Sequence, residues 1–403
     1  MSLARRLSLP EQTAAPVALA VLFYVGHLLC AGWIASSEIF GLASILTVAY
    51  SIHRGLLRPS FHILYYPLAL FAVVSTLSAA TASRSIHSFG ENALWLKILL
   101  FPAAVILFRE IPRSRDVAVR AFLAFGVFSS AFGLIQYFVL GQRDLDHRIT
   151  GPAAHVMTLS GLLLPVALLA LTLWIHDRKN GWLATVTVMS TFALLITFTR
   201  SAWLGWLVAV VVLLVSRRPR ALAWAAPIAL VALSLMPLSL FGRMISSFDT
   251  RQSSNLDRIR MFEAGVEIIK DYPLLGVGPA NVKEIYPLYR KHDAPRFRIP
   301  HLHNNLVQLW AERGVLAPVA YLLLLGLFLR QCLRGWSGAD SRYAEAGMAV
   351  AVGLGAAGIF EFNFGDTEVF WALLDVMAIV VTALEAGRPS NEVAAWTVAE
   401  LRS

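Results

Sequence analysis

This chain is constrained above all by a series of apolar segments, each about as long as a bilayer is thick. A transmembrane helix needs roughly 20 mostly apolar residues, and windows of this kind indicate twelve spans. The spans fall at residues 14–35, 39–53, 62–81, 92–108, 117–140, 155–176, 181–198, 201–216, 221–241, 303–330, 343–361 and 367–385. With 57% apolar and 15% charged residues, the composition is unlike that of soluble domains, in which about 25% of residues are charged. The sequence predicts an all-α, polytopic membrane protein.

The basic residues between the spans predict the orientation, because Lys and Arg in short loops are retained on the cytoplasmic side. With a cytoplasmic N-terminus, the inner segments hold eighteen Lys and Arg residues. The short outer loops hold four, namely Arg84, Arg143, Arg148 and Arg200. Arg5 and Arg6 precede a full-length span, which favours a retained signal anchor over a cleaved signal peptide. We therefore expect both termini in the cytoplasm.

One long segment, residues 242–302, separates the ninth and tenth spans and is expected outside. We expect residues 1–403 to form one integral membrane domain with this segment as its large outer loop. The loop carries ten basic residues against seven acidic ones, which indicates either an anionic partner or lipid headgroups. The formal net charge of +9 does not suggest nucleic acid, because the charges lie between apolar runs, where they set topology.

A helix is predicted within the loop at residues 255–270. Apolar residues recur there at spacings of three and four, and they are Leu256, Ile259, Phe262, Val266 and Ile269. A Ser or Asn residue is the candidate N-cap. Such an amphipathic helix would lie along the membrane surface. Arg258 and Arg260, near its N-terminal end, would hold a phosphate together with free amides, or else form a solvated arginine pair. The GVGP sequence that follows is typical of a plain turn.

Three further basic residues lie in or near the spans. Arg200 interrupts the apolar sequence ITFTRSAWLGWL, and a charge at bilayer depth costs roughly 2.5–3.5 kcal/mol. It is an outer turn, a snorkelling residue or a ligand for an anion, and an intramembrane charge marks a candidate functional site. Arg148, in the short outer loop DLDHRITGPAAH, reaches the same face. Lys97 lies inside the fourth span without an evident partner, and its long stem can snorkel.

The tenth span begins with an unusually polar sequence, PHLHNNLVQLWAERG at residues 300–314. His301 and His303 would point the same way on an extended strand, but no third metal ligand is evident, and we expect no metal. His303 and Asn304 lie at the outer end of the span, where an imidazole can accept a proton. A capping or interface histidine is the alternative. Glu312 and Arg313 lie deeper and have no assigned role beyond a paired charge in the bundle.

Covalent and metalloprotease chemistry are disfavoured. The chain contains no GxSxG and no HExxH sequence, which are the usual marks of these chemistries. Cys30 and Cys332 lie far apart and outside any CxxC or zinc spacing, so neither a disulfide nor a structural metal is expected. What remains is an outward-facing basic site with one histidine, suited to a substrate that is both lipid-bound and phosphorylated.

Three stretches, within residues 145–375, resemble the O-antigen ligase and polymerase superfamily. HNNLVQLWAERG is similar to the family signature of His-Asn, nine residues and Gly, with His303, Asn304 and Gly314 in register. TFTRSAWLGW resembles a family segment of Thr or Ser, Arg, a small residue and an aromatic residue. LDRIRMFEAGVEIIKDYPLLGVGPANVKEIYPLY resembles the family's loop helix followed by Pro-Leu-Gly-x-Gly. Ala317 departs from the glycine, or other small or polar residue, that often follows the signature.

The resemblance implies an inner-membrane transferase that takes an O-antigen glycan from undecaprenyl diphosphate at the periplasmic face. In the ligase branch the acceptor is lipid A core, and the product is lipopolysaccharide. The diphosphate is a good leaving group, so no cofactor or metal is expected if arginines neutralise its charge. His303 would be the general base of an inverting attack, with Arg200 and Arg258 as the diphosphate clamp. The expected substrate-binding residues are Arg148, Asn304, Arg260 and His301.

Two other functions share these features. An O-antigen polymerase uses the same motifs and the same carrier, but it extends the glycan on that carrier. A lipid-linked glycan flippase would need a cavity that opens alternately to both sides, and it would need no base. The compact length and the single large outer loop favour the ligase.

Overall fold

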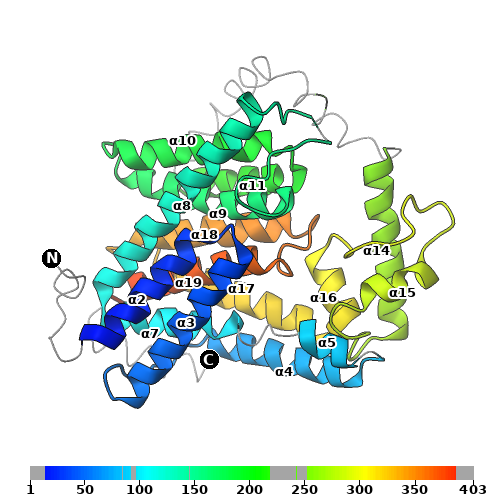
Figure 1. Cartoon of the computed structure of the whole chain (residues 1–403), viewed down its shortest axis with the longest axis horizontal. Coiled ribbons are helices and arrows are strands. Elements are labelled where there is room, and N and C mark those ends of the chain that lie inside the picture. Colours follow the sequence, from blue (N-terminus) through cyan, green and yellow to red (C-terminus); the bar gives the residue numbers. More distant parts are fainter. Residues whose placement is uncertain are drawn as a thin grey trace.

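The computed structural model describes residues 14–83, 85–91, 97–144, 146–217, 242 and 252–386. Over these residues the chain forms helices and no strand (Figure 1). The helices are α2 (Ala14–Leu29), α3 (Ile34–His53), α4 (Tyr65–Thr81), α5 (Ser85–Glu91), α7 (Leu100–Glu110), α8 (Pro112–Phe138), α9 (Val156–His176), α10 (Gly181–Ile196), α11 (Arg200–Arg217), α14 (Ser253–Asp271), α15 (Val282–Tyr289), α16 (Asn305–Arg313), α17 (Leu316–Arg334), α18 (Ser341–Ala357) and α19 (Thr367–Ala386). The predicted ninth span, 221–241, lies outside the described residues.

Most of the predicted spans are present as helices. Within the described residues, six helices are long and apolar enough to cross a membrane, and they are α3, α8, α9, α11, α17 and α19. The apolar helices α2, α4 and α10 are shorter. These helices confirm the predicted all-α, polytopic membrane fold.

The centre of the bundle is built from α9 and α19, because both are apolar on all sides. The most apolar part of each is 89% buried, compared with 28% in α3 and α11, so α3 and α11 are left to face lipid. Small residues let membrane helices approach closely. A Cβ atom on Gly205 of α11 would lie 2.4 Å from the carbonyl oxygen of Gly353 in α18.

A buried polar network connects the first two helices to this centre. Tyr24 donates a hydrogen bond to Asp375 at 2.6 Å, and His27 Nε2 lies 3.2 Å from the same carboxylate. The Ser37 hydroxyl lies 2.8 Å from His27 Nδ1. An isolated carboxylate is costly inside a membrane, so this pairing both satisfies Asp375 and holds the α2–α3 hairpin against α19.

The predicted tenth span, 303–330, is wrong as a single helix. It consists of α16 and α17, which separate at Gly314, where φ is +77°, in the region that favours glycine. A Cβ atom there would lie 1.8 Å from the Leu274 carbonyl oxygen. Val307 and Ala311 of α16 pack in a small apolar cluster with the loop helices rather than in the main core. A window of about 20 residues averages the polar sequence of α16 with the apolar run of α17, so it does not separate the two helices.

The helices α14, α15 and α16 lie together at one end of the bundle, on the right in Figure 1, and α14 runs across that end. The helix predicted at 255–270 is confirmed as α14. The predicted Ser or Asn cap is wrong, because the N-cap position is Gln252 and no side chain caps the helix. Its buried residues include Met261, Ala264 and Ile268. Two residues of the predicted apolar stripe, Ile259 and Phe262, are exposed, so a neighbouring face of the helix does the packing.

Candidate active site

His303 lies immediately before α16 in a backbone conformation that is uncommon for a residue with a side chain. Its φ is +53°, in the left-handed region, and its N–H donates to His301 Nδ1 at 3.3 Å. The helix is capped by Asn304, whose Oδ1 accepts from the Val307 N–H at 3.0 Å. The Asn304 amide also donates to the Ile359 carbonyl at 2.8 Å. The capping role therefore belongs to Asn304, and the His303 imidazole is left for another use.

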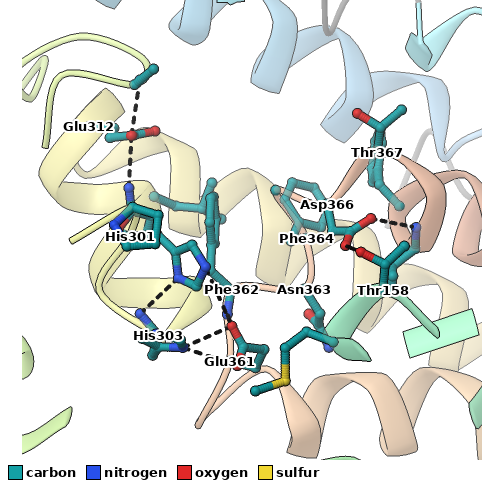
Figure 2. A pocket seen from close by; sticks show the side chains of 18 of the residues that line it. Thr158, His301, His303, Glu312, Glu361, Phe362, Asn363, Phe364, Asp366 and Thr367 are labelled. Carbon is teal, nitrogen blue, oxygen red and sulfur yellow. Dashed lines mark hydrogen bonds and ion pairs between the residues drawn. The ribbon is translucent and has the colours of Figure 1, made fainter. Parts of the chain in front are cut away.

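The His303 ring is oriented by Glu361, a carboxylate that the sequence did not single out. His303 Nδ1 lies 2.9 and 3.0 Å from the two carboxylate oxygens (Figure 2). Because a carboxylate only accepts hydrogen bonds, Nδ1 carries a proton in this contact and Nε2 remains for a substrate. Glu361 lies in the loop between α18 and α19. It ends an apolar run, and the rule that marked Arg200 as an ionisable residue within apolar sequence would also have marked it.

Glu361 is buried and nevertheless ionised. Burial raises the pKa of its carboxyl group, but the His303 hydrogen bond and the charges of His303, His301 and Arg258 outweigh burial and lower the pKa to about 2. Arg258 Nη2 lies 3.5 Å from the carboxylate. A fixed negative charge beside Nδ1 stabilises the imidazolium that forms when His303 takes up a proton.

Arg200 and Arg258, predicted to clamp the diphosphate, lie in one neighbourhood with Arg148, predicted to bind substrate. Arg200 begins α11, and its guanidinium donates to Asn255 Oδ1 at 2.7 Å and to Ser254 Oγ at 3.2 Å, at the start of α14. Arg258 follows on the next turn of α14. Burial, and then the charge of Arg258, lower the pKa of Arg148. Arg148 Nη1 is buried and has no hydrogen-bond partner within the described residues. Positive charges gathered in this way favour an anionic ligand.

Arg260 does not join this group. It pairs with Glu263 at 2.7 Å and with Asp293. Arg296, which the sequence did not single out, lies 3.0 Å from the buried Asp257 and lines the cavity beside His303. The two arginines predicted on the loop helix are therefore divided, because Arg258 faces Glu361 and Arg260 faces other loop residues.

His301 stands beside His303, with ring centroids 4.3 Å apart. Its Nε2 lies 3.7 Å from Glu361, and burial lowers its pKa to about 4, against the raising effect of the Glu361 charge. Ligand atoms of His301, His303 and Glu361 all lie within 4.8 Å of one another, so a third possible metal ligand, unseen in the sequence, is present in space. The charge of Arg258, 3.5 Å from Glu361, opposes a divalent cation, so the group suits proton transfer better.

A cavity of about 720 Å³ opens beside His303 and Glu361. Its walls include three connections that the predicted topology places on one side of the membrane. They are the segment before α9 with Arg148, the large loop with His301, and the loop between α18 and α19 with Glu361. His301 and Glu361 are labelled in Figure 2. This volume is within the range of small-molecule sites. Arg148 lines the cavity, whereas Arg200 and Arg258 do not.

The GVGP turn supports the site by backbone packing. The N–H groups of Val277 and Gly278 donate to the carbonyls of Ala311 and Glu312 at 2.9 and 2.8 Å. A Cβ atom on Gly276 would lie 2.3 Å from the Glu312 carbonyl carbon. Its glycines therefore allow the turn to approach the end of α16 closely, which agrees with its interpretation as a plain turn.

Glu312 and Arg313 form the paired charge predicted from the sequence. Glu312 Oε1 also accepts from the Ala280 N–H at 3.0 Å and from Gln308 Nε2 at 2.7 Å. The Arg313 guanidinium lies over the Phe71 ring, 5.7 Å from its centroid. These contacts satisfy the buried carboxylate and hold α16 against α4 and the turn.

One segment of the chain is similar to a known protein family. Residues 185–322 match a family model described as O-antigen ligase. The matched segment contains Arg200, Arg258 and His303. No curated protein matches the chain. Arg148 and Glu361 lie outside the matched segment, and the fold brings both of them into the lining of the cavity beside His303.

Proposed function

The chain belongs to the O-antigen ligase superfamily, and from this premise we propose that it transfers an O-antigen glycan from undecaprenyl diphosphate to lipid A core at the periplasmic face of the inner membrane. The product would be lipopolysaccharide. The observation that carries the proposal is the His303–Glu361 pair, which lies in a cavity wall beside a group of arginines.

His303 Nε2 is the proposed general base. It removes the proton from an acceptor hydroxyl as that oxygen attacks the anomeric carbon of the donor sugar. The bond between this carbon and the diphosphate oxygen breaks on the opposite face, so the configuration inverts and undecaprenyl diphosphate leaves with the electron pair. Glu361 keeps the ring oriented through Nδ1 and stabilises the imidazolium until the proton passes to water.

The arginines are proposed to hold the leaving diphosphate. Arg200, Arg258 and Arg148 come from three different segments and share one neighbourhood. Guanidinium groups bind phosphate oxygens bidentately, and donors placed in advance stabilise charge that develops on a leaving group. The carrier itself is a good leaving group once this charge is balanced, so we expect transfer to need no metal.

The test is transfer by purified protein in lipid. The protein is incubated with glycan-linked undecaprenyl diphosphate and with rough lipopolysaccharide, which carries lipid A core without O-antigen. Glycan on the core supports the ligase. Elongation on the carrier supports a polymerase instead, and translocation without a new bond supports a flippase; either would contradict the proposal.

The base is tested by His303→Ala, which should reduce the transfer rate by about 1,000-fold or more while binding of undecaprenyl diphosphate persists. His292→Ala, at an exposed position of the same loop, is the matched control and should leave the rate unchanged. Turnover retained in His303→Ala would remove the base assignment.

A further inference from the structure

The cavity beside His303 has a second polar end, formed by side chains that the proposed mechanism does not use. Thr158, Asp366 and Thr367 line this end (Figure 2), together with Lys97. The Thr158 hydroxyl donates to Asp366 Oδ2 at 2.6 Å, and Lys97 Nζ donates to the Thr367 hydroxyl. Lys97, whose partner could not be found from the sequence, is therefore directed into this cluster.

The cluster keeps free hydrogen-bonding capacity. Asp366 Oδ1 caps α19 by accepting from the Val369 N–H at 3.3 Å, and Oδ2 accepts from Thr158. A carboxylate offers about four acceptor sites and an ammonium group three donors. Glu38 lies 3.7 Å from Lys97 Nζ, and Glu368 shares a side-chain hydrogen bond with Asp366. The contacts described here therefore leave at least one donor and one acceptor site.

This chemistry fits sugar hydroxyls better than a second phosphate. An ammonium group and a carboxylate lie together here, whereas the other end of the site gathers guanidinium groups. The Phe362 and Phe364 rings also line the cavity, and aromatic rings offer apolar surface to the C–H face of a pyranose. Carboxylate, hydroxyl and ammonium groups beside aromatic rings are suited to orienting a neutral, polyhydroxylated ring.

Stereochemistry assigns this end to the acceptor. In an in-line displacement the attacking hydroxyl and the leaving diphosphate lie on opposite faces of the anomeric carbon, and the base must lie on the side of the hydroxyl. His303 lines the cavity, whereas Arg200 and Arg258 do not. The loop that carries Glu361 also carries Asp366, five positions later, at the other end (Figure 2). A sugar held at the second end therefore shares the cavity with the base and with Arg148, but not with Arg200 and Arg258.

We propose that Lys97, Thr158, Asp366 and Thr367 form the acceptor subsite, which binds hydroxyl groups of a neutral sugar in lipid A core. This inference rests on the proposed transferase function and names where its second substrate binds. The donor glycan offers the same hydroxyl chemistry, so the experiment must separate the two substrates.

The variants are Asp366→Asn and Thr158→Val. Asn caps a helix about as well as Asp, and Val keeps the shape of Thr without its hydroxyl, so both should fold. We expect each to raise KM for rough lipopolysaccharide about tenfold, because a hydrogen bond to a sugar hydroxyl is lost. KM for the undecaprenyl diphosphate donor should change by less than about twofold. Thr185→Val, at an exposed position on α10, is the control.

A second arm measures binding of rough lipopolysaccharide to the protein carrying His303→Ala, with and without Asp366→Asn, so that it needs no turnover. Weaker binding with Asp366→Asn supports the subsite even if no transfer is detected, and in that case only the proposed function fails. Unchanged acceptor KM and unchanged binding would overturn the subsite while leaving measured transfer intact. A rise confined to KM for the donor would also overturn the acceptor subsite, because this end of the cavity would then bind the donor glycan.

Discussion

Glu361 contacts the His303 ring through both carboxylate oxygens. Substitution of Glu361 therefore tests whether this carboxylate positions the proposed base. Glu361→Gln keeps the size of the side chain but removes the charge that favours the imidazolium. We expect kcat to fall by about 100-fold, with KM for the carrier-linked donor nearly unchanged. The measurement is steady-state transfer in proteoliposomes.

A merely structural role for Glu361 would give a different result. Glu361→Asp restores the charge at a shorter reach and should recover part of kcat. Glu267→Gln, at an exposed position of α14, should behave as the unsubstituted protein. Equal losses of kcat in the Gln and Asp variants, together with a lower Tm in both, would refute the positioning role.

His301 makes a second residue-level prediction, on stability. Its pKa is lowered to about 4, whereas a histidine in an unfolded chain titrates near 6.5, about the usual value. Between these values the unfolded chain binds the proton and the folded chain does not. The stability that comes from His301 is therefore complete above about pH 6.5 and is lost as the pH falls towards about 4.

The pH effect is measured as the thermal unfolding midpoint in detergent from pH 7.5 to 5. The unfolding midpoint of the His301→Gln variant should fall less between pH 7.5 and pH 5 than that of the unsubstituted protein. His292→Gln, at an exposed histidine, should follow the unsubstituted protein. Glu361 does not contribute to the change in the unfolding midpoint between pH 7.5 and 5. Both its pKa of about 2 in the folded protein and the ordinary glutamate pKa of about 4.3 lie below pH 5. Parallel curves for His301→Gln and the unsubstituted protein would contradict the assignment.

How far the sequence predicts such residues depends on whether their signal is local. Arg200 was visible because a charge within an apolar run stands out in one short window. The contact of His303 with Glu361 joins positions 58 apart, and no spacing rule connects them. Lys97 was noticed for the same reason as Arg200, but its partner Thr367 lies 270 positions away. Local anomalies identify candidate residues, and only the fold shows which of them meet.

At the scale of elements, the break between α16 and α17 rests on Gly314. Alanine at φ of +77° costs about 1–3 kcal/mol from conformation alone, and its Cβ atom would overlap the Leu274 carbonyl. Gly314→Ala should therefore lower Tm by several degrees and reduce transfer by displacing α16. Gly181→Ala, where nothing lies within 4 Å of an added Cβ atom, should not lower Tm. An unchanged Tm in Gly314→Ala would show that the turn is not held by this close approach.

Helix α14 shows that the spacing of apolar residues predicts the presence of a helix better than it predicts which face of that helix is buried. Spacings of three and four correctly placed a helix at α14. The apolar stripe was correct as a pattern, yet Ile259 and Phe262 are exposed because Met261 and Ala264 contact the loop cluster instead. A helix with apolar residues on two neighbouring faces does not reveal in sequence which face the protein will cover.

At the scale of the whole molecule, charged residues other than the buried Asp375 gather in two groups at the ends of the spans. The site draws on Arg148, Arg200 and Glu361, which lie at connections predicted outside. At connections predicted inside, Arg109 pairs with Glu385 at 2.7 Å, and His176 contacts Glu345 at 2.9 Å. Charged side chains at a membrane boundary seek partners or water, so this separation is what a bilayer between the two groups would produce.

That arrangement predicts which positions a membrane-impermeant maleimide can reach. Cys30 and Cys332 are free cysteines, so a background with Cys30→Ala and Cys332→Ala is needed first. His292→Cys, in the large loop, should be labelled in intact spheroplasts, whereas Lys179→Cys, between α9 and α10, should be labelled only after lysis. The positive-inside bias predicts this orientation, and a carrier-linked glycan at the periplasmic face can meet His303 only if the large loop lies outside. Labelling of Lys179→Cys alone in intact spheroplasts would place the site in the cytoplasm and refute the proposed reaction, whatever the geometry of its residues.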